Sequence, residues 1–417
     1  MSDAVRDPFA DWTVGRMVPL PSVLPKGWTI SLLTHVARLE SGHTPSRRRP
    51  DYWGGEVPWV SLHDVGRLSK PEISDTLEKI TKLGLANSSA RLLPAGTVIF
   101  SRTASVGKST VLAKPMATTQ DFANFVCGPE VYCKYLMYLF RYNQATWKQL
   151  MAGSIHNTIY MPVFKALQVL LPPRAEQQAI AEVLEDADAL IEGLEALIAK
   201  KRDIKEGAMQ ELLTGDRRLP GFEGEWVTKK LGDVGEVVNG LTYSPTDISE
   251  SGLIVLRSSN VQGGTLAFAD IVRVKADVAA AAFVTKGDIL ICVRNGSRDM
   301  IGKCALIPDH AEKMAFGAFM AVVRAHQPEF IFQVFQSAYM KRQIAERLGA
   351  TINQITNASL RCFEVRMPPT PDEQRAIAKV LSDMDAEIAA LADKLTKARA
   401  VKHGMMQVLL TGEIRLK

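Results

Sequence analysis

The amino-acid sequence is repeated once along the chain, and this repeat constrains the fold more than any other feature. The segment PPRAEQQAIAEVLEDADALI, which starts at Pro172, returns as PPTPDEQRAIAKVLSDMDAEI, which starts at Pro368. The match continues to the ends of both segments, where LLTGDRRL from Leu212 corresponds to LLTGEIRL from Leu409. A repeat of this period predicts two copies of one structural unit.

The residues upstream of each segment match more faintly. Trp28 corresponds to Trp226 and Gly42 to Gly240. The strand-like run AGTVIF from Ala95 corresponds to KGDILICV from Lys286 in the second copy. A chain of 417 residues is too long for one ordinary core. We therefore expect the order module, helix, module, helix. The helices are similar and the modules have diverged. Either the modules have different targets, or the helices tolerate fewer changes than the modules do.

The expected boundaries follow from the repeat. They are an N-terminal tail over residues 1–21, a first module over 22–173, a first long helix over 174–217, a second module over 218–371, and a second long helix with the C-terminus over 372–417.

The segment after each module has the pattern of a long amphipathic helix. Residues 176–213 contain no proline, and apolar residues recur seven positions apart, as in a coiled coil. The first helix ends near Leu213 and the second module begins at Trp226, so the second helix should run back antiparallel to the first, about a pseudo-two-fold axis. Two ordinary core helices are the alternative. The residues expected to pair the helices are Ile180, Val183, Leu190, Leu194 and Leu197 in the first, and Ile377, Val380, Met384, Leu391 and Val401 in the second.

Each module mixes strand-like and helical runs, so we expect a mixed α/β (α+β) fold. Residues 22–173 carry an excess of about eight positive charges and residues 174–219 an excess of about four negative ones. The first module contains the basic loop SGHTPSRRRPDYWGG, in which three arginines precede two aromatic residues. Arginine forks suit phosphate oxygens and guanine edges, although a solvated charge run and polar structural turns are the alternative.

Polar loop residues of both modules are candidates for contact with DNA because hydroxyl, amide and guanidinium groups bind phosphates and base edges. They are Ser41, His43, Thr44, Arg47, Arg48, Arg49, Arg102, Ser105 and Lys108 in the first module, and Arg257, Asn260, Arg294, Asn295, Arg298 and Lys303 in the second.

No motif for catalysis or metal binding is recognisable. The sequence around Gly107-Lys108-Ser109-Thr110 lacks the earlier glycine of a phosphate-binding loop, because Arg102 stands there. The histidines show no metal-ligand spacing, and the five cysteines form no CxxC. We therefore expect no cofactor in this chain. No apolar run approaches the length of a membrane span, the N-terminus lacks the features of a secretory signal, and an odd number of cysteines without CxxC fits a reducing compartment, so we expect a cytoplasmic protein.

Two diverged modules, each followed by a similar long helix, resemble the specificity subunits of type I restriction–modification systems. The resemblance rests on the PP…EQ…IA…L…D…D helix starts, the LLTG ends, LPKGW from Leu24, GEW from Gly224 and the SGHTP turn. It implies that each module is a target-recognition domain that reads one half of a bipartite, asymmetric site on double-stranded DNA. The second module departs from the family pattern at its first turn, where NGLTYSP from Asn239 replaces SGHTPSR.

The same resemblance implies partners and roles. The paired helices would set the gap between the half-sites and dock two methyltransferase subunits, which would bind S-adenosylmethionine, and separate restriction and motor subunits would use ATP. The chain itself would not be an enzyme. The rival interpretations are a coiled-coil scaffold that binds only protein, disfavoured by the basic loops, and a DNA enzyme, disfavoured by the missing motifs.

Overall fold

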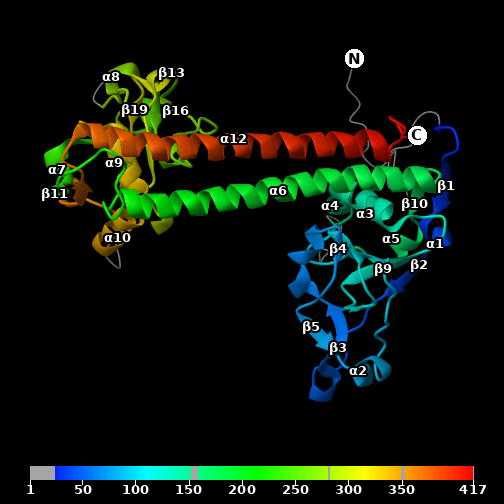
Figure 1. The fold of residues 1–417 in the computed structure, drawn as a ribbon. Coiled ribbons are helices and arrows are strands. Elements are labelled where there is room, and N and C mark those ends of the chain that lie inside the picture. Colours follow the sequence, from blue (N-terminus) through cyan, green and yellow to red (C-terminus); the bar gives the residue numbers. More distant parts are fainter. Residues whose placement is uncertain (1–23, 152–157, 280–281, 349–352, 417) are drawn as a thin grey trace, which may run out of the picture. The chain divides into compact units, whose positions relative to one another are not determined.

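The computed structural model describes residues 24–151, 158–279, 282–348 and 353–416, and the chain divides into two compact units (Figure 1). Unit 1 comprises residues 1–195 and 394–417, and unit 2 comprises residues 196–393. The expected tail over residues 1–21 lies outside the described residues. Each unit contains one module and parts of both long helices.

Module 1, in unit 1, is built on a five-stranded sheet of order β2-β9-β6-β7-β4 and a three-stranded sheet of order β5-β3-β8. Its first strand pairs antiparallel with its last, so the chain enters and leaves the module side by side. The strands are β1 (Thr29–Leu32), β2 (Ala37–Ser41), β3 (Trp53–Val60), β4 (Glu72–Ile73), β5 (Glu78–Ile80), β6 (Val98–Ser101), β7 (Ser109–Leu112), β8 (Ala117–Thr118), β9 (Phe122–Cys127) and β10 (Gln168–Leu171). The helices are α1 (Leu33–Val36), α2 (Lys82–Ala86), α3 (Cys133–Tyr142), α4 (Gln144–Met151) and α5 (Met161–Lys165).

Module 2, in unit 2, repeats this plan with sheets of order β12-β20-β17-β18 and β16-β13-β19, and its first strand β11 again pairs with its last, β21. The strands are β11 (Val227–Lys230), β12 (Gly235–Asn239), β13 (Ile248–Leu256), β14 (Val261–Gln262), β15 (Thr265–Leu266), β16 (Val272–Val274), β17 (Ile289–Cys292), β18 (Cys304–Leu306), β19 (Ala315–Phe316), β20 (Met320–Ala325) and β21 (Glu364–Met367). The helices are α7 (Leu231–Val234), α8 (Ala276–Ala279), α9 (Pro328–Gln336), α10 (Ala338–Arg347) and α11 (Asn357–Arg361). The shared strand order confirms the internal repeat and the mixed α/β class.

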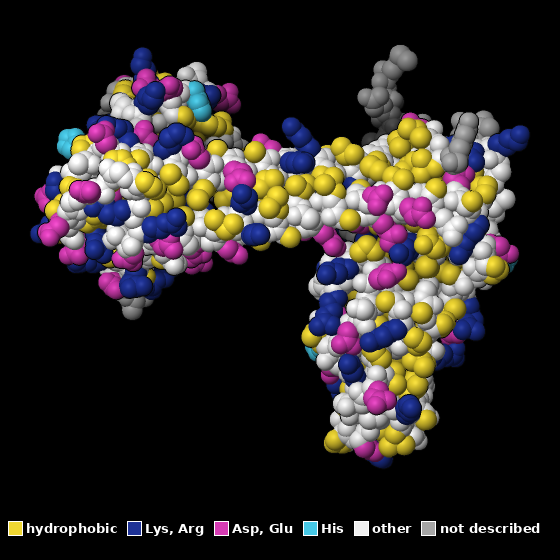
Figure 2. All heavy atoms as spheres, in the orientation of Figure 1, with side chains coloured by type: hydrophobic (Ala, Val, Ile, Leu, Met, Phe, Trp, Pro, Cys, Tyr) yellow, Lys and Arg dark blue, Asp and Glu magenta, His cyan; other side chains and the backbone are white. Residues whose placement is uncertain are grey.

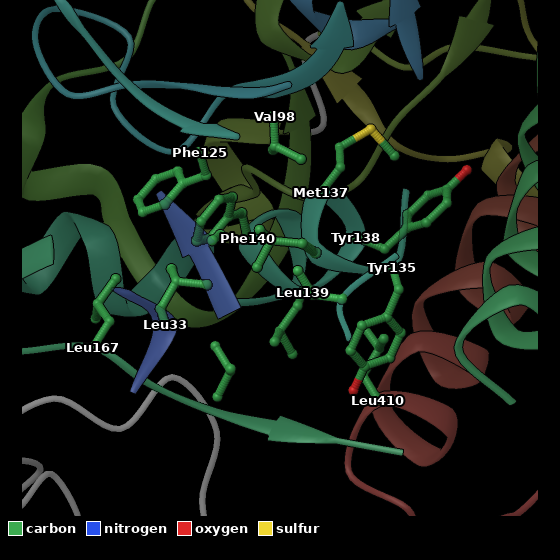
Figure 3. Close-up of a cluster of buried hydrophobic side chains, with 14 of the residues drawn as sticks. Leu33, Val98, Phe125, Tyr135, Met137, Tyr138, Leu139, Phe140, Leu167 and Leu410 are labelled. Carbon is green, nitrogen blue, oxygen red and sulfur yellow. The ribbon is translucent and has the colours of Figure 1, made fainter. Parts of the chain in front are cut away.

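The core of each unit includes residues of both the module and the long helices. In unit 1 the buried side of α3 supplies Tyr135 and Phe140, which pack in one cluster with Phe125 of the sheet and Leu410 of the second long helix (Figure 3). In unit 2, α9 contributes to the equivalent cluster with residues from both long helices. Burial of these large apolar side chains stabilises each module on its helices by about 1.5–3 kcal/mol per residue.

The two long helices are α6 (Arg174–Leu212) and α12 (Pro371–Leu410). In unit 1, Glu195 of α6 pairs with Arg399 of α12, and Asp188 with Lys402. In unit 2, Lys201 and Lys205 of α6 pair with Glu387 and Asp385 of α12. Partner numbers on α12 fall as those on α6 rise, so the expected antiparallel pairing is confirmed within each unit.

The seam between the helices differs in part from the expected one. Ile180, Val183, Ile377, Val380 and Met384 pack in the hydrophobic cores, Leu194 is buried and Leu391 is half-buried, as a pairing role requires.

The prediction is wrong for Leu190, Leu197 and Val401, which are 52%, 38% and 62% exposed. The column next to theirs, which includes Leu184 and Ile198, is buried instead. Helix α6 carries three adjacent apolar columns, and periodicity alone does not decide which two face α12. Apolar side chains consequently lie at the surface along the long helices (Figure 2).

Among the described residues, no helix is long and apolar enough to cross a membrane.

Candidate DNA-recognition site

In both modules a glycine turn packs against the connection between two strands. In module 1 the backbone N–H of His43 donates to the carbonyl of Thr118 at 2.9 Å, and in module 2 that of Leu241 donates to Phe316 at 2.9 Å. A Cβ atom on Gly42 or Gly240 would lie 2.1 Å from a backbone oxygen of this connection. Only glycine fits at such a close approach, which explains why this pair survives in the repeat. We call three elements of each module its rim. In module 1 they are the Gly42 turn, the β8–β9 connection and Arg102, which follows β6; in module 2 they are the Gly240 turn, the β19–β20 connection and Arg294, which follows β17.

Two tryptophans hold the rim turn of module 1 in place. The indole N–H of Trp59 donates to the carbonyl of His43 at 3.0 Å, and that of Trp53 donates to Ser46 at 3.2 Å. The two rings pack edge to face with their centroids 4.9 Å apart. The predicted contact residues of this turn, Ser41 and His43, therefore stand exposed on a fixed backbone.

The three consecutive arginines do not have equal environments. The guanidinium of Arg47 lies 3.6 Å from the ring centroid of Trp53 and donates to both carboxylate oxygens of Glu78, at 2.6 and 2.9 Å. These hydrogen bonds hold the pKa of Glu78 below its usual value. Arg49 makes a similar two-pronged contact with Asp51, at 2.9 and 2.7 Å.

Arg48, between them, is exposed, and no hydrogen bond or ion pair joins its side chain to the described residues. Arg48 is therefore the arginine of the run whose donors are most available to a ligand.

The other predicted residues of module 1 surround the β8–β9 connection and the β6–β7 loop. Thr44 donates to the Gln120 side chain at 2.8 Å, and the Nε of Arg102 donates to the Gln120 carbonyl at 2.9 Å. The structure thus brings Thr44 and Arg102 together on the rim. Lys108 extends instead to the carbonyl of Val65, at 3.4 Å, and Ser105 is half-buried in the same loop.

The predicted residues of module 2 fall into different surroundings. Arg257 pairs with Asp270 at 2.7 Å, and the Asn295 amide donates to Ser258 at 3.0 Å. Arg294 is exposed beside Phe319.

Arg298 and Lys303 line a cleft of about 1380 Å³ in unit 2, which is bounded on its other side by residues of α6. The Arg298 guanidinium there donates to the carbonyls of Ala345 and Leu348, at 3.3 and 3.4 Å. Arg298 is thus bound to the end of α10 while facing the cleft.

The prediction of a DNA contact is wrong for Asn260. Its side chain is fully buried, with the amide nitrogen donating to the carbonyls of Ala267 and Asp270 and the oxygen accepting from the backbone of Arg257. Both amide hydrogens and the carbonyl oxygen thus serve the local turn. A sequence pattern of polar residues in a loop does not separate such a buried turn residue from an exposed one.

Sequence reasoning missed Glu78, Gln120 and Phe319, which lie at or beside the rims. Phe319 follows a short strand in a region where the two modules match poorly, and Glu78 lies 31 residues from its partner Arg47. No motif marks either residue, although alignment of the two modules by strand order places Phe319 at the position of Asp121.

Repeated ion pairs join each module to the helix ends. In unit 1 the buried Glu176 accepts from Arg415, at 2.5 and 2.7 Å, and from the Trp28 indole at 3.1 Å. In unit 2 the buried Glu373 accepts from Arg218, at 2.9 and 2.5 Å. We call these the end pairs.

A second pair of contacts lies further along each helix. Asp188 of α6 accepts from Tyr138 of module 1 at 2.7 Å and pairs with Lys402 of α12. Burial lowers the pKa of Lys402 and raises that of Tyr138.

In unit 2 the corresponding Asp385 accepts from Gln333 of module 2 at 3.1 Å and from Lys205 of α6 at 2.6 and 2.7 Å. We call Asp188–Lys402 and Asp385–Lys205 the inner pairs. Each ties a module and both helices together.

A model of the type I restriction modification DNA specificity domain matches residues 25–200 and again residues 223–398. These two matches cover most of the chain and coincide with the repeat. The chain belongs to this family. It is a type I specificity subunit with two target-recognition domains, and its family supports a role in DNA-sequence specificity rather than that of a protein-binding scaffold.

Curated relatives agree with this assignment. The chain is 28% identical over 238 residues to the type I restriction enzyme MjaIX specificity subunit of Methanocaldococcus jannaschii, a match that covers 52% of this chain and 54% of that protein. It is 24% identical over 420 residues to the MjaVIII specificity subunit of the same organism, covering 94% of each.

Solved structures share the fold. The crystal structure of a type I restriction–modification system S subunit from M. genitalium superposes with a TM-score of 0.60 at 15% identity, covering 95% of this chain and 98% of that one. The specificity subunit thus shares the fold of this S subunit over nearly the whole chain.

Proposed function

We propose that each target-recognition domain reads one half of a bipartite, asymmetric site on double-stranded DNA through its rim. The observation that carries the proposal is that the two domains share one strand order but differ in the side chains of the rim. Two readers with different contact residues select two different half-sites. The excess of positive charge in module 1 favours the phosphate backbone.

The long helices, in this proposal, set the gap between the half-sites and dock two methyltransferase subunits. The end pairs and inner pairs support this role, because they fix each domain on both helices through buried or half-buried charges. Restriction and motor subunits complete the assembly, which works in the cytoplasm. S-adenosylmethionine and ATP are bound by those partners, and the chain itself holds no cofactor.

The chain is also proposed to be non-catalytic. Among the described residues, no group of three or more His, Cys, Asp or Glu side chains is placed to hold a metal ion. Purified chain alone is expected to show no nuclease, methyltransferase or ATPase turnover. Metal- or ATP-dependent turnover that follows the chain through purification and disappears on mutation of its residues would contradict this.

Mapping of adenine methylation across the genome tests the DNA-reading role. Cells with the gene should methylate one bipartite motif that is absent after its deletion and returns on complementation. A methylation pattern that is identical with and without the gene would contradict the proposal and favour a scaffold.

Lengthening of the helices tests their role as spacers. Seven residues inserted into both α6, near Gly193, and α12, at the matching turn, retain the heptad seam and add about 10 Å. The preferred gap should grow by about three base pairs, at roughly 3.4 Å each. An unchanged gap would show that the helices do not set the spacing.

A further inference from the structure

Phe319 is a large apolar side chain that the fold of module 2 leaves at the surface. It lies on the connection between β19 and β20, is 53% exposed, and belongs to none of the hydrophobic clusters. Its backbone is nevertheless fixed, because its carbonyl accepts from the N–H groups of Val293 at 3.0 Å and Arg294 at 3.1 Å. The exposed ring is therefore held on a rigid support.

Arg294 lies beside this ring. Its guanidinium carbon is 5.0 Å from the Phe319 ring centroid, and the side chain is exposed. The backbone of Arg294 bridges to Gln354, and the N–H of Asn295 donates to Asn353 at 3.4 Å, so the loop that carries the arginine is also anchored. The pair presents an apolar surface and a cation on one edge of the module.

The corresponding position of module 1 has the opposite character. Ser101 of β6 pairs with Phe122 in module 1, and Cys292 of β17 pairs with Met320 in module 2. Phe319, one residue before Met320, is thus equivalent to Asp121. Asp121 accepts from Thr103 and from Thr119, both at 2.9 Å, and so forms part of a closed polar network.

Both positions belong to the rim. Gly42 packs against Thr119 in module 1 as Gly240 packs against Gly317 in module 2. The turn of module 2 lacks the SGHTP pattern, and its tyrosine, Tyr243, approaches Gly317. The repeat therefore places an exposed aromatic residue and an arginine where module 1 has polar side chains.

We propose that Phe319 and Arg294 form a DNA-contacting element of the second target-recognition domain, in which Phe319 packs against the 5-methyl group of a thymine in the major groove. This inference rests on the proposed DNA-reading function. The thymine methyl is the one apolar group that the base edges present in that groove, and phenylalanine is a side chain that contacts it. Arg294 supplies the charge for an adjacent phosphate, which module 2 otherwise has little basic excess to bind.

Replacement of single thymines by deoxyuridine removes only the methyl group and leaves the protein unchanged. The full chain assembled with its methyltransferase subunit is titrated with duplexes of the mapped site, each with one thymine replaced. Replacement of one particular thymine in one half-site should lower the affinity of the complex about fourfold, the value expected for one buried methyl-sized group. F319A should weaken binding by a similar or larger factor, and the deoxyuridine at that position should then have no further effect.

The controls separate this element from its surroundings. I248A removes a side chain of the same 53% exposure from another part of module 2 and should leave both affinity and thymine dependence unchanged. R294A should reduce the salt dependence of binding by about 0.9 in slope, whereas F319A should not change the slope. F319L, which keeps an apolar side chain, should retain part of the thymine dependence.

Three results would overturn the inference while leaving the proposed function intact. In the first, no deoxyuridine replacement changes the affinity of the wild-type complex. In the second, the F319A complex keeps the thymine dependence of the wild type, and in the third, F319A binds DNA normally but no longer assembles with the methyltransferase subunit. A wild-type complex without sequence-selective binding would instead contradict the proposed function itself.

Discussion

The two units agree at the helices and disagree at the rims. Glu176–Arg415 and Glu373–Arg218 are the same ion pair in the two copies, as are Asp188–Lys402 and Asp385–Lys205. The rim of module 1, in contrast, is a closed polar network around Gln120 and Asp121, and that of module 2 presents Phe319. Residues that hold a module on its helices have stayed the same, while residues at the exposed rim have changed, as expected where two copies share a scaffold but differ in target.

Even the shared pairs have different environments. The Trp28 indole donates to Glu176, whereas the indole nitrogen of Trp226 is buried without a hydrogen-bond partner in the described part of unit 2. Asp188 is 18% exposed at its side chain, whereas Asp385 is 41% exposed. The energy of equivalent contacts should therefore differ between the units.

The largest effect is expected from removal of module 2 together with the whole of α12. A fragment of residues 1–218 keeps α6 but loses α12, which leaves apolar side chains such as Ile180 and Leu184 uncovered at about 1.5–3 kcal/mol each. The fragment carries Asp188 together with Lys205 on α6, and Glu176 together with Arg218, which follows α6, so a second copy can rebuild both kinds of ion pair. Sedimentation should show a homodimer.

A charge reversal sharpens this test. The D188K fragment should dissociate because lysines then face each other, and D188K with K205D should dimerise again. A soluble, folded monomer of the unmodified fragment would refute the equivalence of the two helices.

The next effect compares the inner pairs in the full chain. K402A leaves Asp188 with Tyr138 and a more distant Arg141 in a mostly buried site, and should lower the free energy of unfolding by about 3 kcal/mol. K205A leaves the more exposed Asp385, which water can solvate, at a cost of about 1 kcal/mol.

Urea unfolding of both variants measures the difference. R399A, which removes an exposed pair with Glu195, serves as the control and should change little. Equal losses for K402A and K205A would show that the burial of the aspartate does not set the energy of the pair.

The smallest effect concerns the arginines of module 1. R48A should reduce the slope of log affinity against log salt by about 0.9, the loss of one phosphate contact. The double variant R49A with D51N preserves the local net charge and should leave the slope unchanged, because these two side chains neutralise each other. A slope change for the double variant and none for R48A would reverse this assignment.

The fold was predictable to the extent that the repeat determines it. The spacing of Pro172 and Pro368 predicts two modules, and the strand-like and helical runs within each predict a mixed α/β fold. The heptad pattern and the short connection to Trp226 predict the antiparallel helices. The seam was predicted only in part, because Leu184 and Leu190 lie on adjacent columns and their burial depends on how α12 packs.

The site was less accessible to sequence reasoning. Arg47 and Arg48 are identical in type and adjacent, yet a glutamate 31 residues away from Arg47 decides which of them is available. Asn260 is polar and lies in a loop, but the surrounding backbone takes up its hydrogen bonds. Such distinctions depend on contacts between distant segments, which local composition does not record.

The most direct test of the account is the DNA site methylated with the 1–218 fragment, compared with that of the full chain. If each module reads its own half-site, cells that express the fragment with the methyltransferase subunit should methylate an inverted repeat of one half of the full-length motif, since a dimer carries module 1 twice. Methylation of the original asymmetric motif by the dimeric fragment would contradict the assignment of one half-site to each module.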